Sequence, residues 1–403
     1  MASGTKAGIT EGGPDPLSAT SSLGALIRAA HQRPVHIIFV HGMRAEGPGT
    51  SAAFRDRLCA HVGDGCQSGG AHAARVQFDL GAYPSEANIL HRPIWSTEAE
   101  WLASRPFVDR YVFSRRSGAP IIVDEVNWWP LLFPLKCRFL LKPESNLSGV
   151  DKKHLQLCAR SDDPFYPWLS QDEVDHLIAT PPKSGGGARL NAILKREIMN
   201  WGLSDAVMAV GSMRLYYRRA MNAAFGYAAM FDGKPVDERE FVVISESLGS
   251  FAVMDAYEHV DAPHNAVRDV LDRTYLLYFF ANQFALLELA RVEGLPGFSV
   301  SADIADGAPA PSASPLKALE HWAQHQSHTE RFSESDHSVR VSQIIAFNDP
   351  SDLLTFDVPA ITGVKVVNLY DRNGFDFVGW FENPITAHTG HSANKNVLRA
   401  MFE

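Results

Sequence analysis

The chain has 403 residues, of which 45% are hydrophobic and 21% are charged, and its formal net charge is −9. This composition is typical of a globular protein. No dense cluster of lysine and arginine occurs, which argues against a nucleic-acid partner because phosphate binding needs clustered cations. No run of about 18 apolar residues occurs, so we expect no membrane-spanning helix. The N-terminal residues do not resemble a secretory signal. We therefore expect a cytoplasmic protein, with leaderless export as the alternative.

Four cysteines stand at irregular spacings and form no Cys-x-x-Cys pair: Cys59, Cys66, Cys137 and Cys158. Structural zinc sites use closely spaced ligand pairs, so the spacing argues against zinc. In a reducing compartment the four side chains are expected to be free, mostly buried thiols. Disulfides are expected only if the protein is exported.

Residues 1–32 are expected to form a disordered tail and a short leading helix, and residues 33–403 a single α/β domain. Buried strands are predicted at 35–40, 120–126, 241–244, 275–279, 341–347 and 364–369. Helices are predicted at 51–62, 203–229, 249–259, 283–291 and 394–402. Apolar strands that alternate with helices indicate a parallel sheet covered on both faces.

Two long segments interrupt this alternation. Residues 64–118 look irregular, with one possible strand at 76–80, and residues 128–200 contain an apolar stretch and a glycine-rich linker. Six of the eight tryptophans fall in this insert region or directly after it: Trp95, Trp101, Trp128, Trp129, Trp168 and Trp201. These tryptophans either line a substrate pocket or form a second small core.

The most informative stretch is Ser245-Glu246-Ser247-Leu248-Gly249, which follows an apolar strand and precedes a helix. A serine on such a sharp strand-to-helix turn is forced outward, where a base and a substrate can reach its hydroxyl. The turn needs small residues two positions before and after the serine, and Ser245 and Gly249 meet this need. The alternative is that Ser247 caps the helix and has no chemical role.

In this context the stretch resembles the nucleophile elbow of the α/β-hydrolase superfamily, in its lipase and esterase branch, although Ser245 replaces the usual glycine. The resemblance covers residues 33–63, 119–127, 203–292 and 340–403. It implies an α/β-hydrolase fold, which is a mainly parallel sheet with helices on both faces. It does not account for the insert region at 64–118 and 128–200, where family members often carry a cap over the active site.

The resemblance also implies the site residues. Ser247 is the expected nucleophile, and the backbone N–H groups of Met43 and Leu248 are the expected oxyanion hole. His41, before Gly42 and Met43, is expected to be a structural hydrogen bonder rather than a base. The family places its nucleophile, acid and base in this order along the chain. Catalysis by these residues requires no cofactor and no metal, so we expect neither.

Two aspartates and two histidines compete for the remaining roles. Asp352 is followed by two apolar residues, as the family's acid is, whereas Asp349 precedes Pro350 and is expected to form a turn. His388 stands in an Ala-His-x-Gly setting on the loop before the last helix, and His391 is its rival. In the expected mechanism His388 takes the Ser247 proton and Asp352 fixes the histidine tautomer.

These residues predict a serine hydrolase that cleaves carboxylic esters with an apolar acyl group or a lipid, with possible peripheral contact with a lipid interface. The alternatives are a lipid-acting toxin or effector phospholipase and a non-catalytic binding scaffold. His321, His325 and His328 share helical spacing, which could also hold a metal ion. We interpret them instead as a solvated helix face.

Overall fold

A computed structural model describes much of the chain, with gaps between the described segments. The described residues are 10–11, 22–30, 32–43, 47–63, 66, 69–81, 88–89, 92–93, 95, 97–140, 152–159, 169–179, 195–211, 213–230, 239–259, 264–288, 314–327, 331–333, 338–340, 342–374 and 384–403.

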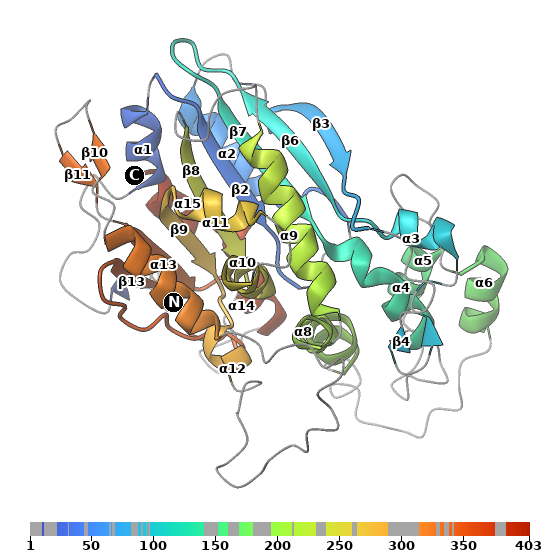
Figure 1. The fold of residues 1–403 in the computed structure, drawn as a ribbon. Helices are drawn as coiled ribbons and strands as arrows, with labels where there is room; N and C mark the ends of the chain where they lie inside the picture. The colour runs from blue at the N-terminus through green and yellow to red at the C-terminus, as the bar shows by residue number, and fades with distance from the viewer. Residues whose placement is uncertain are drawn as a thin grey trace, which may run out of the picture.

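One large mixed sheet runs through the molecule (Figure 1). Its strand order is β1-β13-β12-β9-β8-β2-β7-β6-β3. The six strands from β13 to β7 are parallel, while β6 and β1 run antiparallel to their neighbours. The strands are β1 (Thr10–Glu11), β2 (Val35–Val40), β3 (Ala71–Gln77), β6 (Phe107–Phe113), β7 (Ile121–Asn127), β8 (Glu240–Glu246), β9 (Thr274–Phe280), β12 (Gln343–Asn348) and β13 (Lys365–Tyr370). Two short hairpins, β4–β5 (Asn88–Ile89, Arg92–Pro93) and β10–β11 (Arg331–Ser333, Ser338–Arg340), lie outside this sheet.

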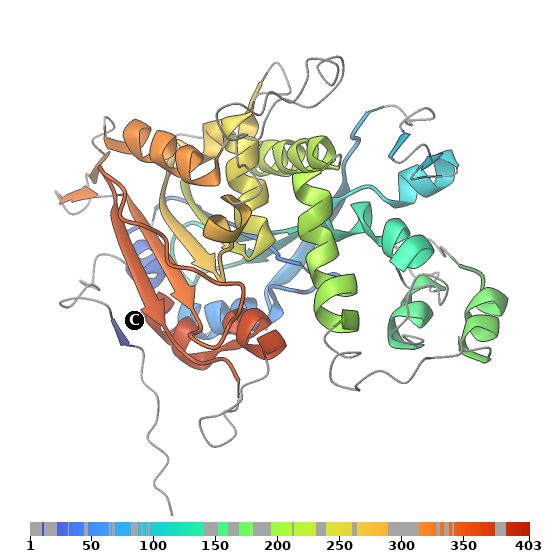
Figure 2. The ribbon, with the colours of Figure 1, turned by 90° about the horizontal axis from the view of Figure 1, so that it is seen from below.

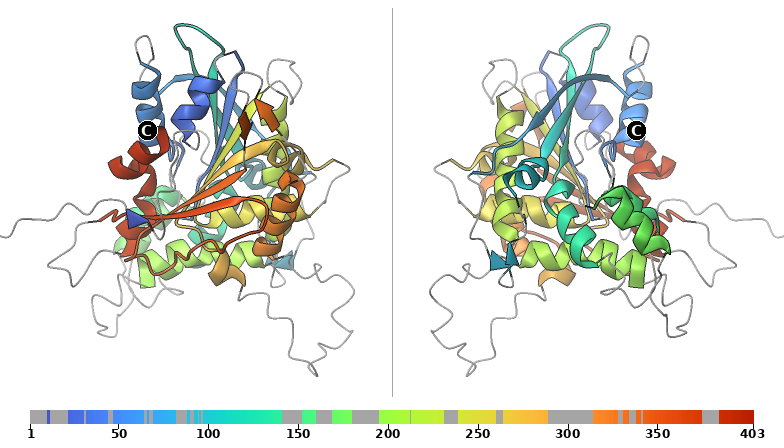
Figure 3. Two further views of the ribbon diagram at one scale, coloured as in Figure 1. Left: turned by 90° about the vertical axis from the view of Figure 1, so that its left-hand side faces the viewer. Right: turned by 90° about the vertical axis from the view of Figure 1, so that its right-hand side faces the viewer.

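Helices cover both faces of the sheet (Figure 3), as the sequence predicted. One face carries α9 (Arg214–Ala229), α10 (Leu248–Glu258), α11 (Ala266–Leu271) and α13 (Pro315–Ser327). The other carries α1 (Leu23–Ala29), α2 (Ala52–Val62) and α15 (Lys395–Phe402). Side chains of β8 alternate between the two cores, with Phe241 and Val243 in one and Val242 and Ile244 in the other. Within the described residues no helix is long and apolar enough to cross a membrane.

The segment 64–118 is more regular than expected. Instead of one strand at 76–80 it contributes both β3 and β6 to the sheet edge. The strand β6 was not predicted from sequence because Asp109 and Arg110 interrupt its apolar pattern. Both are buried as ion pairs: Asp109 accepts from Arg75 at 2.7 Å, and Arg110 donates to Asp124 of β7 at 2.6 Å.

The N-terminal tail also differs from its predicted disorder. Thr10 and Glu11 form the edge strand β1, which pairs antiparallel with Tyr370 and Leu369 of β13. Residues 1–9 and 12–21 lie outside the described part of the chain.

The described parts of the 128–200 insert pack beside the sheet (Figure 2). They form η1 (Trp129–Leu131), α4 (Phe133–Leu135), η2 (Lys136–Leu140), α5 (Lys152–Cys158), α6 (Gln171–Ala179), η3 (Lys195–Leu203) and, just after the insert, α8 (Ser204–Val210). Trp129, Phe133 and Trp201 belong to a separate small core, whereas Trp95, Trp101 and Trp128 join the main core. Trp168 falls outside the described residues, and a cap over the site stays a prediction.

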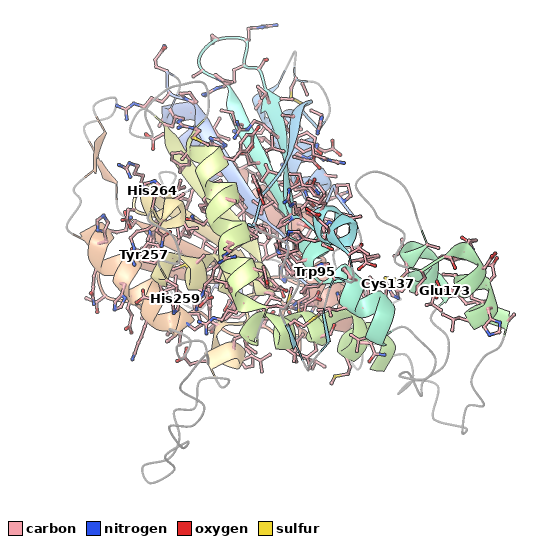
Figure 4. All side chains as sticks on the ribbon, turned by 45° about the vertical axis from the view of Figure 1, so that its right-hand side comes forward. Trp95, Cys137, Glu173, Tyr257, His259 and His264 are labelled. Atoms are coloured by element: carbon pink, nitrogen blue, oxygen red, sulfur yellow. A yellow bond between two sulfur atoms is a disulfide. The ribbon has the colours of Figure 1, made fainter. Side chains whose placement is uncertain are left out.

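All four cysteines are paired, which corrects the expectation of free thiols. Cys59 at the end of α2 bonds Cys66, and Cys137 of η2 bonds Cys158 of α5. Figure 4 shows Cys137 on the side of the insert that faces the sheet, with Glu173 on the outlying helix α6. The second disulfide thus crosses the small core of the insert, where Cys137 and Cys158 are fully buried.

We predict that replacing Cys137 and Cys158 together with alanine lowers the free energy of unfolding by about 3 kcal/mol, because the crosslink restricts the unfolded chain. Urea denaturation measures this loss. Thiol titration of the denatured, unreduced wild type should find no free thiol. Four titratable thiols, or an unchanged urea midpoint in the double variant, would contradict the pairing.

Candidate active site

Ser247 occupies the turn between β8 and α10 with φ 53° and ψ −121°. Positive φ is rare outside glycine and costs conformational energy, and it concentrates at functional positions. The Ser247 N–H donates to the Phe280 carbonyl of β9 at 2.7 Å, which fixes the strained turn to the neighbouring strand. The structure therefore has the sharp strand-to-helix turn that the sequence indicated.

Two glycines let the end of β2 approach this turn. A Cβ on Gly42 would lie 2.7 Å from the Ser247 Cβ, and one on Gly249 would lie 2.6 Å from the His41 carbonyl oxygen. Both separations are shorter than real Cβ contacts, so only glycine fits without a shift of the backbone. The backbone at Gly42 therefore lies directly against the turn at Ser247.

The structure brings Ser247, His388 and Asp352 into one hydrogen-bonded chain. Ser247 Oγ lies 2.7 Å from His388 Nε2, and His388 Nδ1 lies 2.7 Å from Asp352 Oδ2. All three side chains are buried. His388 comes from α14 (Pro384–Thr389), a short helix where the sequence predicted a loop, and Asp352 follows β12.

Asp352 is held as a charged acceptor. Its Oδ1 accepts from the Leu354 N–H at 2.9 Å, and its Oδ2 also accepts from the Thr355 hydroxyl. Burial acts to raise the pKa of Asp352, but the hydrogen bond and charge of His388, helped by these donors, bring it below its ordinary value. A carboxylate in this state keeps the proton of the neutral histidine on Nδ1 and leaves Nε2 free to accept from Ser247.

Asp349 takes a different position from its rival. Its Oδ1 accepts from the Ser351 N–H at 2.8 Å and its Oδ2 from the Asn373 N–H at 2.6 Å. The Asn373 side chain in turn donates to the Ala387 carbonyl at 2.6 Å, one residue before His388. Asp349 therefore orders the turn at Asn373, which in turn holds the helix that carries His388. Asn373 was not identified from sequence, because it lies in a polar turn without a recognisable motif.

His391, the rival base, is fully buried near His388 but does not bond Ser247. Its ring stacks on Phe280 with centroids 6.2 Å apart, and neither ring nitrogen has a hydrogen-bond partner among the described residues. Burial, followed by the charge of His388, lowers the pKa of His391 to about 3, although Asp352 opposes this shift. His391 is therefore neutral at physiological pH.

His41 fixes the end of β2 through hydrogen bonds to Gly42 and Trp128. Its Nδ1 donates to the Gly42 carbonyl at 2.7 Å, and its Nε2 accepts from the Trp128 N–H at 3.3 Å. The Trp128 indole donates back to the His41 carbonyl at 2.9 Å and stacks on the imidazole. Burial lowers the pKa of His41 to about 4, so the ring is neutral. These contacts hold the end of β2 at Gly42, next to Ser247. The Leu248 amide begins α10, where helix N–H groups lack intrahelical acceptors.

Glu246 is a residue that sequence reasoning did not assign. It directly precedes Ser247, is 8% exposed, and has its pKa raised by burial to about 8. Its signal was a lone acid at the end of an otherwise apolar strand. A carboxyl group with this pKa is mostly protonated at neutral pH.

The histidines at helical spacing on α13 make surface ion pairs. His321 Nδ1 lies 2.9 Å from a Glu258 oxygen, and His325 Nε2 lies 3.6 Å from an Asp272 oxygen. His328 lies outside the described residues. Within the described part of the chain, no group of three or more His, Cys, Asp or Glu side chains is placed to hold a metal ion.

We predict that Asp352→Asn lowers kcat by about 10⁴, because the amide favours the wrong histidine tautomer. Asp349→Asn should cost far less, since it keeps one acceptor oxygen for the local turn. Steady-state kinetics on a chromogenic ester compare the two variants. A larger loss for Asp349→Asn than for Asp352→Asn would show that the acid is misassigned.

Glu246 makes stability depend on pH in a defined direction. Its folded pKa of about 8 exceeds its ordinary value of 4.5, so between these pH values the folded state holds a proton that the unfolded state has lost. The Glu246 contribution to stability is therefore lost as pH rises from about 5 to 8. We predict that Glu246→Gln is more stable than wild type at pH 8 and closer to it at pH 5. Urea unfolding at both pH values checks this; a difference that does not change with pH would contradict it.

Comparison with known proteins returned no matching family model, no matching curated protein and no matching solved structure. What the site does must therefore be judged from its own chemistry: a strained serine, a hydrogen-bonded histidine and a buried carboxylate at the carboxyl end of a parallel sheet.

Proposed function

We propose that the protein is a serine hydrolase of the α/β-hydrolase type, with Ser247 as nucleophile, His388 as base and Asp352 as acid. The observation that carries this proposal is the continuous hydrogen-bonded chain from Ser247 Oγ through both ring nitrogens of His388 to Asp352 Oδ2, with 2.7 Å at each step. A serine hydroxyl is a poor nucleophile alone, and an adjacent oriented base is the usual way to activate it.

The geometry supports a two-step reaction. His388 Nε2 removes the Ser247 proton while Oγ attacks the ester carbonyl, and the imidazolium is stabilised by Asp352. His388 then returns the proton to the leaving alcohol as the carbon–oxygen bond of the ester breaks. Water attacks the resulting acyl-enzyme by the same route in reverse, which releases the acid and restores the serine.

The Met43 and Leu248 amides are proposed to bind the carbonyl oxygen when it becomes an oxyanion. Support comes from the contact of the Gly42 backbone with Ser247 and from the position of Leu248 as the first residue of α10. Two fixed N–H donors are worth several kcal/mol of barrier in such sites.

We propose an ester with an apolar acyl chain, including lipids, as the substrate. Leu353 and Phe356, which follow the acid, are 72% and 41% exposed. Large apolar side chains exposed beside a buried site suit contact with an apolar substrate or a lipid surface. The same triad also serves thioesters and amides.

The cellular location bears on the biological role. Two disulfides favour an oxidising compartment over a reducing cytoplasm. The two disulfides therefore favour export over a cytoplasmic location. Among the alternative functions, they favour an exported hydrolase that acts on lipids. A non-catalytic scaffold is disfavoured, since binding alone needs no hydrogen-bonded triad.

We predict that a fluorophosphonate probe labels wild type at Ser247, and that Ser247→Ala abolishes both labelling and ester hydrolysis, because the Ser247 hydroxyl is the group bonded to His388 Nε2. Mass spectrometry of the labelled peptide and p-nitrophenyl ester assays from acetate to octanoate measure the two effects. Each buried methylene should add about 0.8 kcal/mol of binding.

Ser250→Ala is the matched control, since Ser250 lies three residues away and bonds Ser245 instead of His388. It should retain labelling. Undiminished labelling of Ser247→Ala would refute the assignment, and a flat chain-length profile would refute the apolar acyl site alone.

A further inference from the structure

A second strained residue lies beside the nucleophile. Ala281 has φ 47°, and with Ser247 it completes the set of non-glycine residues with positive φ in the described part of the chain. Glu246 pairs with Phe280 in the parallel register of β8 and β9, so Ser247 and Ala281 each take the next position at adjacent strand ends. Strained backbone positions concentrate at functional sites, so two of them at adjacent strand ends indicate that both turns belong to the site.

The turn at Ala281 is fixed by hydrogen bonds on either side. Its N–H donates to the Phe347 carbonyl of β12 at 3.0 Å, and the next side chain, Asn282, donates to the Phe356 carbonyl at 2.7 Å. This arrangement places Gln283 at the start of α12 (Phe284–Glu288), against the Met43 side chain.

The Gln283 side chain is buried without adequate partners. It is 1% exposed, its Nε2 faces the Met43 sulfur at 4.0 Å, and its Oε1 has no hydrogen-bond partner among the described residues. Sulfur is a weak acceptor, and a buried amide oxygen with no donor is unfavourable. An apolar side chain could be buried here at a lower cost in folding free energy. Stability therefore does not explain why a carboxamide occupies this position.

We infer that Gln283 is a specificity-determining residue, whose carboxamide oxygen accepts a hydrogen bond from an O–H or N–H group on the acyl part of the substrate. This inference rests on the proposed function. The acyl side is assigned because Gln283 contacts Met43, the residue whose amide faces the scissile carbonyl in the proposed mechanism. The substrate is then an ester with a polar donor near the carbonyl and an apolar remainder.

Matched ester pairs test this inference. The first pair is the p-nitrophenyl esters of 3-hydroxybutyrate and 3-methylbutyrate, in which a methyl group replaces the hydroxyl. The second is those of N-acetylglycine and 4-oxopentanoate, in which a methylene replaces the N–H. For each pair, the ratio of kcat/KM values is measured in wild type, in Gln283→Met and in Gln171→Met, an exposed control on α6.

Wild type and Gln171→Met should prefer the donor-bearing ester of at least one pair, and Gln283→Met should lose about ten-fold of that preference, because an unpaired polar group is replaced by an apolar one of similar length. Comparing ratios between variants cancels the intrinsic reactivity of each ester. The melting temperature of Gln283→Met should equal or exceed that of wild type.

Equal ratios in wild type and Gln283→Met for both pairs would overturn the inference. So would a Gln283→Met variant that melts lower and loses all four activities equally, since that result indicates a structural residue. Fluorophosphonate labelling of Ser247 separates the two proposals. Labelled wild-type enzyme that hydrolyses none of the four esters counts against the Gln283 assignment alone, whereas unlabelled wild type refutes the hydrolase and the inference together.

Discussion

The contact between the ends of β2 and β8 is the constraint on which the site depends. Gly42 and Gly249 lack the Cβ atoms that would keep these two strand ends apart. The turn at Ser247, with its φ of 53°, lies at this contact. The same closeness places the amide after Gly42 beside the serine. The proposed nucleophile and the proposed oxyanion donors therefore depend on one packing arrangement rather than on separate loops.

Buried charges keep these strands in register. Asp124 of β7 accepts from His36 of β2 at 2.8 Å and from Arg110 of β6, which ties three neighbouring strands together inside the sheet. Burial lowers the pKa of His36, while the charge and hydrogen bond of Asp124 oppose the shift. Such a network adds little net stability, but the loss of one member leaves the others buried and unpaired. It therefore disfavours a slip of register that would move the end of β2 away from Ser247.

Much of the sheet was predictable from sequence, because its central strands are apolar on both faces and helices separate them. The order of Ser247, Asp352 and His388 along the chain located the residues that the fold brings together. The features that local sequence patterns did not predict depend on contacts with residues far away in the chain. The strand β6 carries charges that pair with Arg75 and Asp124, residues of other strands. The burial of Gln283 against Met43 likewise arises only when distant parts of the chain meet. The cysteine pairs had no spacing signature, since folding alone brings their side chains together.

The two edges of the sheet have consequences for how the protein behaves in concentrated solution. At one edge, β3 is interrupted by a register shift between His72 and Ala74. At the other, the two residues of β1 cover part of β13. Irregular or covered edges resist pairing with the strands of another molecule. Removing the first dozen residues would leave the backbone groups of Leu369 and Tyr370 unpaired on that side. A shortened chain with an intact active site would then be prone to assemble edge to edge.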